Sequence, residues 1–314
     1  MTRVPVFSAR QVELAVPPEL AVEAVRDAFV AHFHGDWTMP PKVYVTNYPA
    51  GDFRAMPALG GGHALLKWVT SFPGNPARGL PTVSGLVLLS DAETGELEAL
   101  FEAGAVTALR TGAAAVLAAE TLGRSDASTA AVVGAGVNGR AAARSFLARG
   151  RAVSIWDVDG PRARAAAAEL GARVASSLQE ALAADLLVTV TPGHEILLGD
   201  GSLAPGQHVS LMGADGPGKA EISAAELART RKFCDDWEQA SHGGELAQAV
   251  KARLVSEDDV GRLGAVLAGA AAGRTGDGEI TTFDSTGLAI QDLAIALAAY
   301  RRIGEVAELG QLEL

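Results

Sequence analysis

Residues 129–149 contain the feature that most restricts how this chain can fold. A short apolar run over 129–133 leads directly into Gly134-Ala-Gly136-Val-Asn-Gly139, and an alanine-rich segment of helical composition follows over 140–149. A strand, a G-x-G-x-x-G turn and a helix in this order are typical of a dinucleotide-binding unit. The pattern therefore predicts an α/β fold built on a doubly wound parallel (Rossmann) sheet.

Each glycine of this turn has a separate predicted role. Gly134 permits the tight turn, Gly136 lets the backbone approach a pyrophosphate, and Gly139 lets the helix pack closely on the strand. The phosphates are expected at the helix N-terminus, where free N–H groups and the helix dipole favour anions. The predicted phosphate-binding residues are Gly134, Gly136, Val137, Asn138 and Gly139.

A second expected strand, over 152–156, ends at Asp157, which lies 23 residues beyond Gly134. An acid at about this distance usually accepts hydrogen bonds from the ribose hydroxyls. Because a carboxylate there repels the 2′-phosphate of NADP, NAD is the predicted cofactor, although Arg162 and Arg164 lie nearby. The alternative is a glycine-rich turn followed by an ordinary strand-end Asp. It is disfavoured because glycine spacing, strand context and acid spacing agree.

Strands and helices continue to alternate after Asp157, as a doubly wound sheet requires. Ligands on such sheets bind beyond the carboxyl ends of the strands. We therefore expect cofactor contacts at Val190, Thr191, Met212 and Gly213, with Asp215 in the loop beyond. The expected elements are helices 161–170 and 177–183 and strands 173–175, 185–190, 207–212 and 232–235.

The first hundred residues predict a smaller, β-rich α+β domain for the substrate. We expect this domain to comprise residues 1–120, completed by a C-terminal segment over 286–314, and the Rossmann domain to comprise 121–285. The expected elements are helices 18–34, 103–121 and 288–300, extended runs 43–47, 53–56, 64–70, 82–90 and 96–102, and a hairpin turn at 91–95.

The composition of the chain argues against nucleic-acid and membrane partners. Acids outnumber bases 37 to 26, whereas nucleic-acid binding needs clustered positive charge, so no nucleic-acid partner is expected. No apolar run approaches the roughly 18 residues of a membrane span, so no membrane partner is expected either. The one cysteine, Cys234, and an N-terminus without a long apolar core favour a cytoplasmic location.

Lysine usage singles out a candidate base. Five of the 26 basic residues are lysines and the other 21 are arginines, so a lysine kept here can supply what a guanidinium cannot, namely loss of a proton near neutral pH. Lys67 lies in the apolar run 65–69, where desolvation lowers the pKa of an ammonium group towards the range of a general base. The alternative is a lysine snorkelling at a strand end. Arg54 and Arg110 could grip a carboxylate bidentately, although for each Arg alone a surface charge is the favoured explanation.

Nine segments together resemble the ornithine cyclodeaminase/mu-crystallin family, and they run through nearly the whole chain. Lys42 stands where the cyclodeaminases of that family more usually have Arg. The sequence around Lys42, Lys67 and 242–245 is similar to that of the archaeal-type alanine dehydrogenase branch of the family. The segments are MPPKVYV (39–45), RAMP (54–57), LKWV (66–69), PGNP (73–76), GLPTV (79–83), RTGAA (110–114), GADGPGK (213–219), QASHGGE (239–245) and EITTFDSTGLAIQD (279–292).

The resemblance implies an NAD-dependent enzyme that acts on a small amino acid. It implies that Lys67 and Asp215 form the acid/base pair, that Lys42 and Thr82 lie near the substrate, and that Arg110 and Thr111 lie near the cofactor phosphates. A homodimer formed through the β-rich domain is implied as well. An ornithine cyclodeaminase, a reductase of cyclic ketimines such as pyrroline-2-carboxylate, and a non-catalytic small-molecule binder resembling mu-crystallin remain open.

Three further patterns do not predict a catalytic or metal site. Asp284-Ser-Thr-Gly287 resembles half of an aspartic protease site, but that chemistry needs two facing carboxylates, so we expect it to cap the last helix. His32 and His34 have no neighbouring ligands at metal spacing, and no metal site is predicted. His242-Gly-Gly-Glu245 fits the family wording without suggesting a mechanism.

Overall fold

The computed structural model describes residues 3–216 and 218–314, which divide into two compact units. The first unit runs up to Arg110 and includes Leu288–Leu314, and the second is Thr111–Gly287. The boundary falls inside one continuous helix, α3 (Ala103–Leu122), so neither a turn nor a linker marks it in the sequence. The expected boundary near residue 120 lies further along the same helix. Pro217, part of the GADGPGK segment, lies outside the described residues.

The second unit is built on an eight-stranded sheet in which every neighbouring pair of strands is parallel. Its strands are β7 (Ala130–Val133), β8 (Val153–Trp156), β9 (Arg173–Val174), β10 (Leu186–Thr189), β11 (His208–Leu211), β12 (Arg231–Cys234), β13 (Val260–Arg262) and β14 (Thr281–Asp284). The spatial order is β13-β12-β14-β11-β10-β7-β8-β9. The run from β9 to β11 reproduces the Rossmann strand order, so the predicted doubly wound fold is confirmed. The strand order reverses between β7 and β10, which is where such sheets bind ligands.

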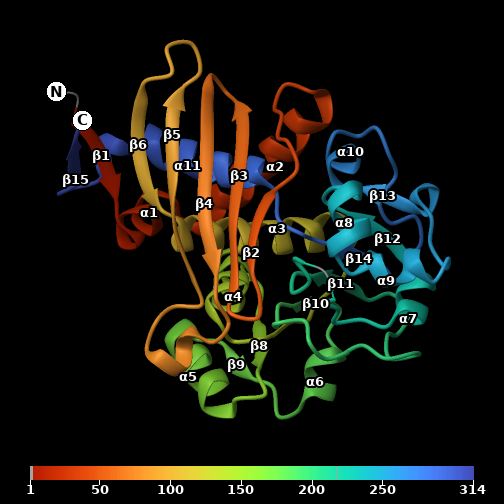
Figure 1. Cartoon of the computed structure of the whole chain (residues 1–314). Helices are drawn as coiled ribbons and strands as arrows, with labels where there is room; N and C mark the ends of the chain where they lie inside the picture. Colours follow the sequence, from red (N-terminus) through yellow and green to blue (C-terminus); the bar gives the residue numbers. More distant parts are fainter. Residues whose placement is uncertain (1–2, 217) are drawn as a thin grey trace. The chain divides into compact units, whose positions relative to one another are not determined.

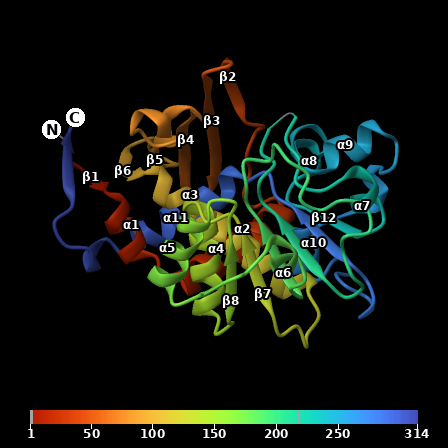
Figure 2. The ribbon, with the colours of Figure 1, turned by 90° about the horizontal axis from the view of Figure 1, so that it is seen from below.

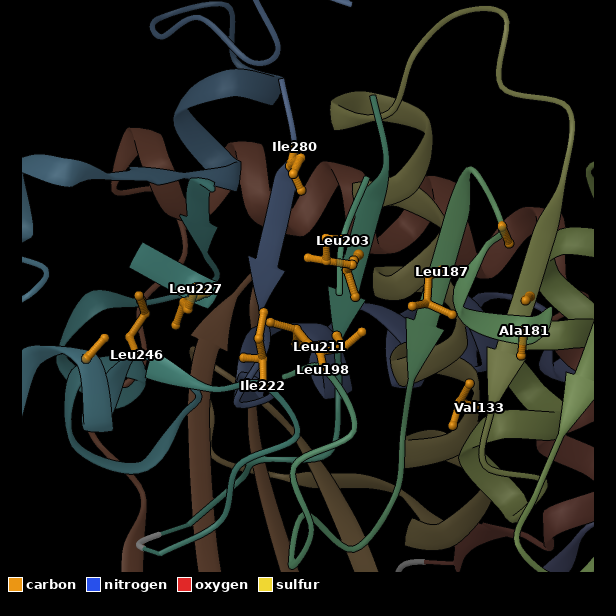
Figure 3. Close-up of a cluster of buried hydrophobic side chains, with 14 of the residues drawn as sticks. Val133, Ala181, Leu187, Leu198, Leu203, Leu211, Ile222, Leu227, Leu246 and Ile280 are labelled. Atoms are coloured by element: carbon orange, nitrogen blue, oxygen red, sulfur yellow. The ribbon is translucent and has the colours of Figure 1, made fainter. Parts of the chain in front are cut away.

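The core of this unit forms on strands that are buried along their whole length. Such continuous apolar runs are typical of parallel strands covered on both faces. Figure 3 shows Val133, Leu187 and Leu211 on three neighbouring strands, with Ile222 and Leu246 contributed by segments packed against them. The helices of the unit are α4 (Val137–Ala148), α5 (Gly160–Leu170), α6 (Leu178–Leu182), α7 (Ala224–Ala228), α8 (Trp237–Gly243), α9 (Leu246–Lys251) and α10 (Leu263–Leu267).

The segment 284–287 differs from its expected role. Asp284 is the last residue of β14, an inner strand between β11 and β12, and the residue that caps the last helix is Leu288. The three residues after Asp284 donate hydrogen bonds to the buried carboxylate of Asp235 instead. The prediction of a helix cap at 284–287 is therefore wrong, because a four-residue strand rich in threonine carries little periodic signal.

The first unit is built on a seven-stranded sheet in the order β15-β1-β6-β5-β4-β3-β2. Its strands are β1 (Arg3–Phe7), β2 (Val43–Asn47), β3 (Gly51–Gly60), β4 (His63–Ser71), β5 (Val83–Asp91), β6 (Leu97–Glu102) and β15 (Gly310–Glu313). Neighbouring strands are antiparallel except for β1 and β6, which are parallel. The β-rich character expected for this region is thus present, with β1 and β15 as additions at one edge.

Within the described part of this unit, helices cover one face of the sheet, and the other face, called the bare face here, carries exposed apolar side chains. Helix α11 (Ala289–Arg301) packs on β3 and β4 and against α2 (Pro18–His34), as Figures 1 and 2 both show. A shorter helix, α1 (Ala9–Ala15), lies near β6. Because side chains alternate between the faces of a strand, the pairing of Arg54 with Val69 and of Met56 with Lys67 puts all four on one face. That face is the buried one.

Helix α3 has the length and composition of a membrane span, the one such helix among the described residues. Within its most apolar window, 67% of the residues are buried inside the protein. A long apolar helix that is mostly buried is typical of a protein core.

Gly139 brings the first turn of α4 against the loop that precedes it. A Cβ atom at this position would lie 1.7 Å from the carbonyl oxygen of Gly134, a distance that no side chain tolerates. Gly134 itself has φ +110° and falls in the region that favours glycine. By contrast, a Cβ atom at Gly136 would meet nothing within 4 Å.

The Gly139→Ala variant should therefore lower the melting temperature. The added methyl group must push β7 and α4 apart, and overpacking of this kind costs about 1–3 kcal/mol. Gly136→Ala is the matched control, because Gly136 has φ −72° and a residue change at such an N-cap position costs less than about 1 kcal/mol. Calorimetric unfolding of the two variants without ligand measures the difference, and equal melting temperatures would contradict the packing argument.

Candidate functional site

A buried ion pair lies at the centre of the first unit. The alternation of β4 turns Lys67 to the covered face of the sheet, where its side chain is 1% exposed. Its Nζ atom lies 2.7 Å from Oδ2 of Asp292 on α11, whose side chain is fully buried. Nζ also donates a hydrogen bond of 3.3 Å to Oγ1 of Thr107 on α3. The expected general base is therefore held by two helices of its own unit.

Lys67 is surrounded by further positive charge. Arg110 places Nε 3.5 Å from Oδ1 of Asp292, and Lys42 is close enough to influence Lys67 electrostatically. Burial lowers the pKa of the Lys67 ammonium from 10.5 to about 8, the direction that the apolar run predicts. The carboxylate of Asp292 partly opposes this shift, whereas Arg110 and Lys42 add to it. Lys67 can thus exchange a proton near neutral pH.

Arg54 faces the same side of the sheet as Lys67. Its Nε atom donates a hydrogen bond of 2.6 Å to Asp52, and its guanidinium lies 5.4 Å from the ring centroid of Tyr44. The side chain is nearly buried, so it is not the free surface charge that its residue type alone would suggest. Thr82 lies just before β5, where its carbonyl oxygen accepts the N–H of Phe72.

Sequence reasoning assigned no role to Asp292 or Gln291. Both are fully buried on α11, and Oε1 of Gln291 accepts hydrogen bonds from Arg110 Nη1 and from the N–H of Leu288. The sequence does carry a signal: Asp292 is the one charged residue in the helix segment 289–299, in which every other residue except Gln291 is apolar. A charge in such a position is almost always paired.

In the second unit, the glycine turn has the form that a dinucleotide phosphate requires. Gly136 caps α4 with open space around it, and Val137 is 70% exposed in the first turn, beside Asn138. The first N–H groups of a helix have no partner within the helix and attract anions. The open approach at Gly136 and this helix terminus fit a bound pyrophosphate.

Asp157 stands directly after β8 and ties it to the glycine turn. Oδ2 accepts the N–H of Ala135 at 2.7 Å, and Oδ1 accepts the N–H of Asp159 at 2.8 Å. Nη1 of Arg162 lies 3.6 Å from Oδ1 of Asp157. The acid is therefore placed where the fingerprint predicts.

Thr111 is buried at the start of the second unit, next to a close contact between α3 and α4. A Cβ atom on Gly112 would lie 2.6 Å from backbone atoms of Ala141. Thr111 thus lies beside the helix that follows the glycine turn, whereas Arg110, the residue before it, belongs to the first unit.

The strand ends after β10 and β11 are joined by one carboxylate. Thr191 and Gly213 both donate their backbone N–H groups to Glu221. Val190 and Met212 are the first residues after β10 and β11 and directly precede these two donors. Asp215 follows in the loop, partly buried, with Lys219 Nζ 2.6 Å from its Oδ1. The structure thus gathers Lys42, Arg54, Lys67 and Arg110 in the first unit, and the predicted cofactor residues at neighbouring strand ends in the second.

Comparison with known proteins gives consistent results. The chain is 41% identical to the alanine dehydrogenase of Archaeoglobus fulgidus over 305 residues, which are 94% of each protein. An archaeal alanine dehydrogenase dimer solved with bound NAD superposes with a TM-score of 0.93 at 37% identity, over 100% of both chains. The Δ1-pyrroline-2-carboxylate reductase of Thermococcus litoralis, solved with NADH and L-proline, gives a TM-score of 0.92 at 26% identity, over 98% of this chain and 100% of that one.

The model of the ornithine cyclodeaminase/mu-crystallin family matches residues 4–306. This range includes all the segments that carry the resemblance in the sequence. The match covers the whole eight-stranded sheet and the seven-stranded sheet except Arg3 and β15, together with the residues around Lys67 and the glycine turn. The chain belongs to the ornithine cyclodeaminase/mu-crystallin family.

Proposed function

We propose that this protein is an NAD-dependent amino-acid dehydrogenase whose substrate is L-alanine. The reaction converts L-alanine, NAD⁺ and water into pyruvate, ammonium, NADH and a proton, and it is reversible. The observation that carries the proposal is the buried Lys67, with a pKa of about 8, among Asp292, Arg110 and Lys42. The identity to the Archaeoglobus fulgidus alanine dehydrogenase supports the choice of substrate.

The glycine turn and Asp157 would hold NAD. The open backbone at Gly136 admits the pyrophosphate, and the carboxylate of Asp157 favours ribose hydroxyls over a 2′-phosphate. Related structures solved with NAD or NADH support this cofactor. When bound, NAD supplies the hydride acceptor, and the protein supplies orientation and proton transfer.

Lys67 would prepare the substrate amine. An amino acid at neutral pH carries an ammonium group, which must lose a proton before its nitrogen lone pair can assist oxidation at Cα. Neutral Lys67 accepts that proton, because its pKa of about 8 leaves part of the population unprotonated at neutral pH. Asp215, from the loop after β11, would handle the second proton, on the water that becomes the carbonyl oxygen.

Positive side chains of the first unit would bind the substrate carboxylate. Lys42, Arg54 and Arg110 are the candidates, because a guanidinium or ammonium group stabilises a carboxylate that leaves water. Thr82 would add a hydroxyl group at the edge of the site.

The charge balance around Lys67 favours a substrate without a second amine. Asp292 is already paired with Lys67 and Arg110, and Asp52 is paired with Arg54. The distal ammonium of ornithine would add another cation to this group. The same balance is neutral towards cyclic imino acids, so a reductase of pyrroline-2-carboxylate is the second candidate, supported by the Thermococcus litoralis neighbour.

A substrate panel tests the proposal. With NAD, we expect NADH absorbance to rise with L-alanine and to stay flat with L-ornithine, L-proline and L-aspartate. Lys67→Ala should lower kcat/KM for alanine about 100-fold or more, the usual contribution of a general base. Lys251→Ala, a change of an exposed lysine at the end of α9, is the matched control and should leave the rate unchanged.

Three other outcomes would replace alanine dehydrogenase by a different activity. Ammonia released from ornithine without net NADH would indicate a cyclodeaminase. NADH consumption with pyrroline-2-carboxylate alone would indicate an imine reductase. Binding of NAD and amino acids without turnover would indicate a mu-crystallin-like binder.

The pH dependence follows from the pKa of Lys67. Alanine oxidation needs the neutral amine, so kcat/KM should rise about tenfold per pH unit below pH 8 and level off above it. Asp292→Asn removes the anion that stabilises the ammonium form, so the rising limb should move to lower pH. A shift to higher pH in this variant would refute the assignment of the limb to Lys67.

We also propose that the bare face of the first sheet binds a second copy of this chain. The register aligns Val43, Ala55, Trp68 and Leu86 in one row across four strands, and three of these side chains are exposed and large. Val45, Leu59 and Leu66 are further exposed apolar side chains on three of these strands, β2, β3 and β4. An apolar surface of this kind marks a protein interface, and the archaeal alanine dehydrogenase neighbour is a dimer.

Light scattering coupled to gel filtration tests this assembly. The parent protein should have the mass of two chains, and Trp68→Lys should have the mass of one, because a charge cannot be buried unpaired at the centre of an apolar interface. Val158→Lys, at a position 88% exposed in the second unit, is the control and should stay dimeric. A monomeric parent protein would contradict the proposal.

A further inference from the structure

Three buried carboxylates of the second unit have no part in the proposed reaction. Glu221, Glu245 and Asp284 are each at most 1% exposed. Among the residues that the structure describes, no group of three or more His, Cys, Asp or Glu side chains is placed to hold a metal ion. All three carboxylates accept hydrogen bonds from backbone N–H groups, and these contacts indicate their role.

Glu221 accepts four hydrogen bonds from the ends of two neighbouring strands. Its Oε1 atom accepts both the N–H and the hydroxyl of Thr191, each at 2.7 Å. Its Oε2 atom accepts the hydroxyl of Thr189 at 2.7 Å and the N–H of Gly213 at 3.0 Å. A single side chain thus fixes the chain where it leaves β10 and where it leaves β11.

The fit between Glu221 and these strand ends is tight. A Cβ atom on Gly213 would lie 2.4 Å from the carboxyl carbon of Glu221, so a residue with a side chain cannot stand at 213 without displacing the carboxylate. The two strand ends are those predicted to line the cofactor, next to the reversal of strand order at β10. Their polar donors point inwards to Glu221, which orients the rest of each loop.

Glu245 in turn holds the backbone of Glu221. Both its carboxylate oxygens lie 2.9 Å from the N–H of Glu221, and Oε2 lies 3.3 Å from the N–H of Ile222. Asp284 accepts the N–H of Leu246 at 2.9 Å and so fixes the start of α9. Ile222 and Leu246 belong to the hydrophobic core, which anchors both acids. The His242-Gly-Gly-Glu245 segment thus gains a structural role.

The two glutamates differ in the charge that their contacts favour. Burial and the nearby charges of Glu221 and Asp284 raise the pKa of Glu245 well above its ordinary value. Burial also raises the pKa of Glu221, but its four donors favour the anion. An amide is therefore a close substitute for the neutral acid at Glu245, whereas at Glu221 it would turn an N–H₂ group towards N–H donors.

We propose that Glu221 is a positioning residue that holds the loops after β10 and β11 in the shape that binds NAD. The inference rests on the proposed function only in that the bound molecule is NAD. Glu221 itself makes no contact with the reacting atoms in this assignment. It acts through Thr191 and Gly213.

A matched pair of variants, Glu221→Gln and Glu245→Gln, tests the inference by calorimetric titration with NAD. We expect Glu221→Gln to raise the Kd for NAD about tenfold or more, which corresponds to about 1.4 kcal/mol, near the contribution of one hydrogen bond. Glu245→Gln should stay within about threefold of the parent protein, since the amide mimics a neutral acid. The KM for alanine, which the first unit binds, should be the same in both variants.

Hydrogen exchange of the ligand-free protein gives a second readout. In Glu221→Gln, the amides of Thr191 and Gly213 should exchange faster than in the parent protein, with β7 and β8 unchanged. Thr189→Val removes a single donor to Glu221 and keeps the volume, so it should weaken NAD binding in the same direction even if Glu221→Gln does not fold.

The outcomes separate the two proposals. A parent protein that does not bind NAD would overturn the proposed function and, with it, the positioning role. A parent protein that binds NAD, with an equal Kd in Glu221→Gln and Thr189→Val, would overturn the positioning role alone. Equal losses in Glu221→Gln and Glu245→Gln would show a general effect of packing and would also overturn it.

Discussion

The cost of burying an ammonium group governs the arrangement of the first unit. An unpaired charge in a protein interior is strongly destabilising, and a lysine there survives by pairing or by losing its proton. Lys67 does both in part: Asp292 lies 2.7 Å away, and the pKa nevertheless falls to about 8. The pairing requires α11, near the end of the chain, to lie against β4, near its beginning. The same contact that permits the burial therefore fixes the topology of the unit.

In the second unit, the groups that need partners are buried backbone N–H donors rather than a buried cation. Parallel strands that end inside a covered sheet leave N–H groups with no strand partner, and each unpaired group costs stability. Carboxyl oxygens solve this by accepting the N–H groups: Asp157 binds the glycine turn, Glu221 the ends of β10 and β11, and Glu245 the segment after Lys219. Burial raises the pKa values of Glu221 and Glu245, and the backbone N–H groups that they accept oppose that shift.

The parts that the sequence predicts well are those with a local signal. Helix 18–34 and strand 43–47 occur with the expected bounds, because periodicity and flanking residues define them. The glycine turn carries its own backbone requirement, so its position is also predictable. The partner of Lys67 is not, because 225 residues separate Lys67 from Asp292 and no local pattern encodes that pairing. The prediction of a helix cap at 284–287 is wrong for the same reason: only the tertiary structure shows that Ser285 and Gly287 donate hydrogen bonds to Asp235.

A lysine poised near pH 8 also explains how one scaffold can support several reactions. In the proposed role, its neutral form would accept a proton from an amine and its charged form would return one to an imine, so the ion pair with Asp292 would serve oxidation, reduction and cyclisation alike. Discrimination must then come from the charges that meet the rest of the substrate. In this chain Asp292 and Asp52 are both committed to cations of the protein. A side chain that brings a second ammonium group finds no compensating charge in this cluster, whereas the methyl group of alanine needs none. Under the proposed function, the charge balance around Lys67 would therefore select the substrate of this chain.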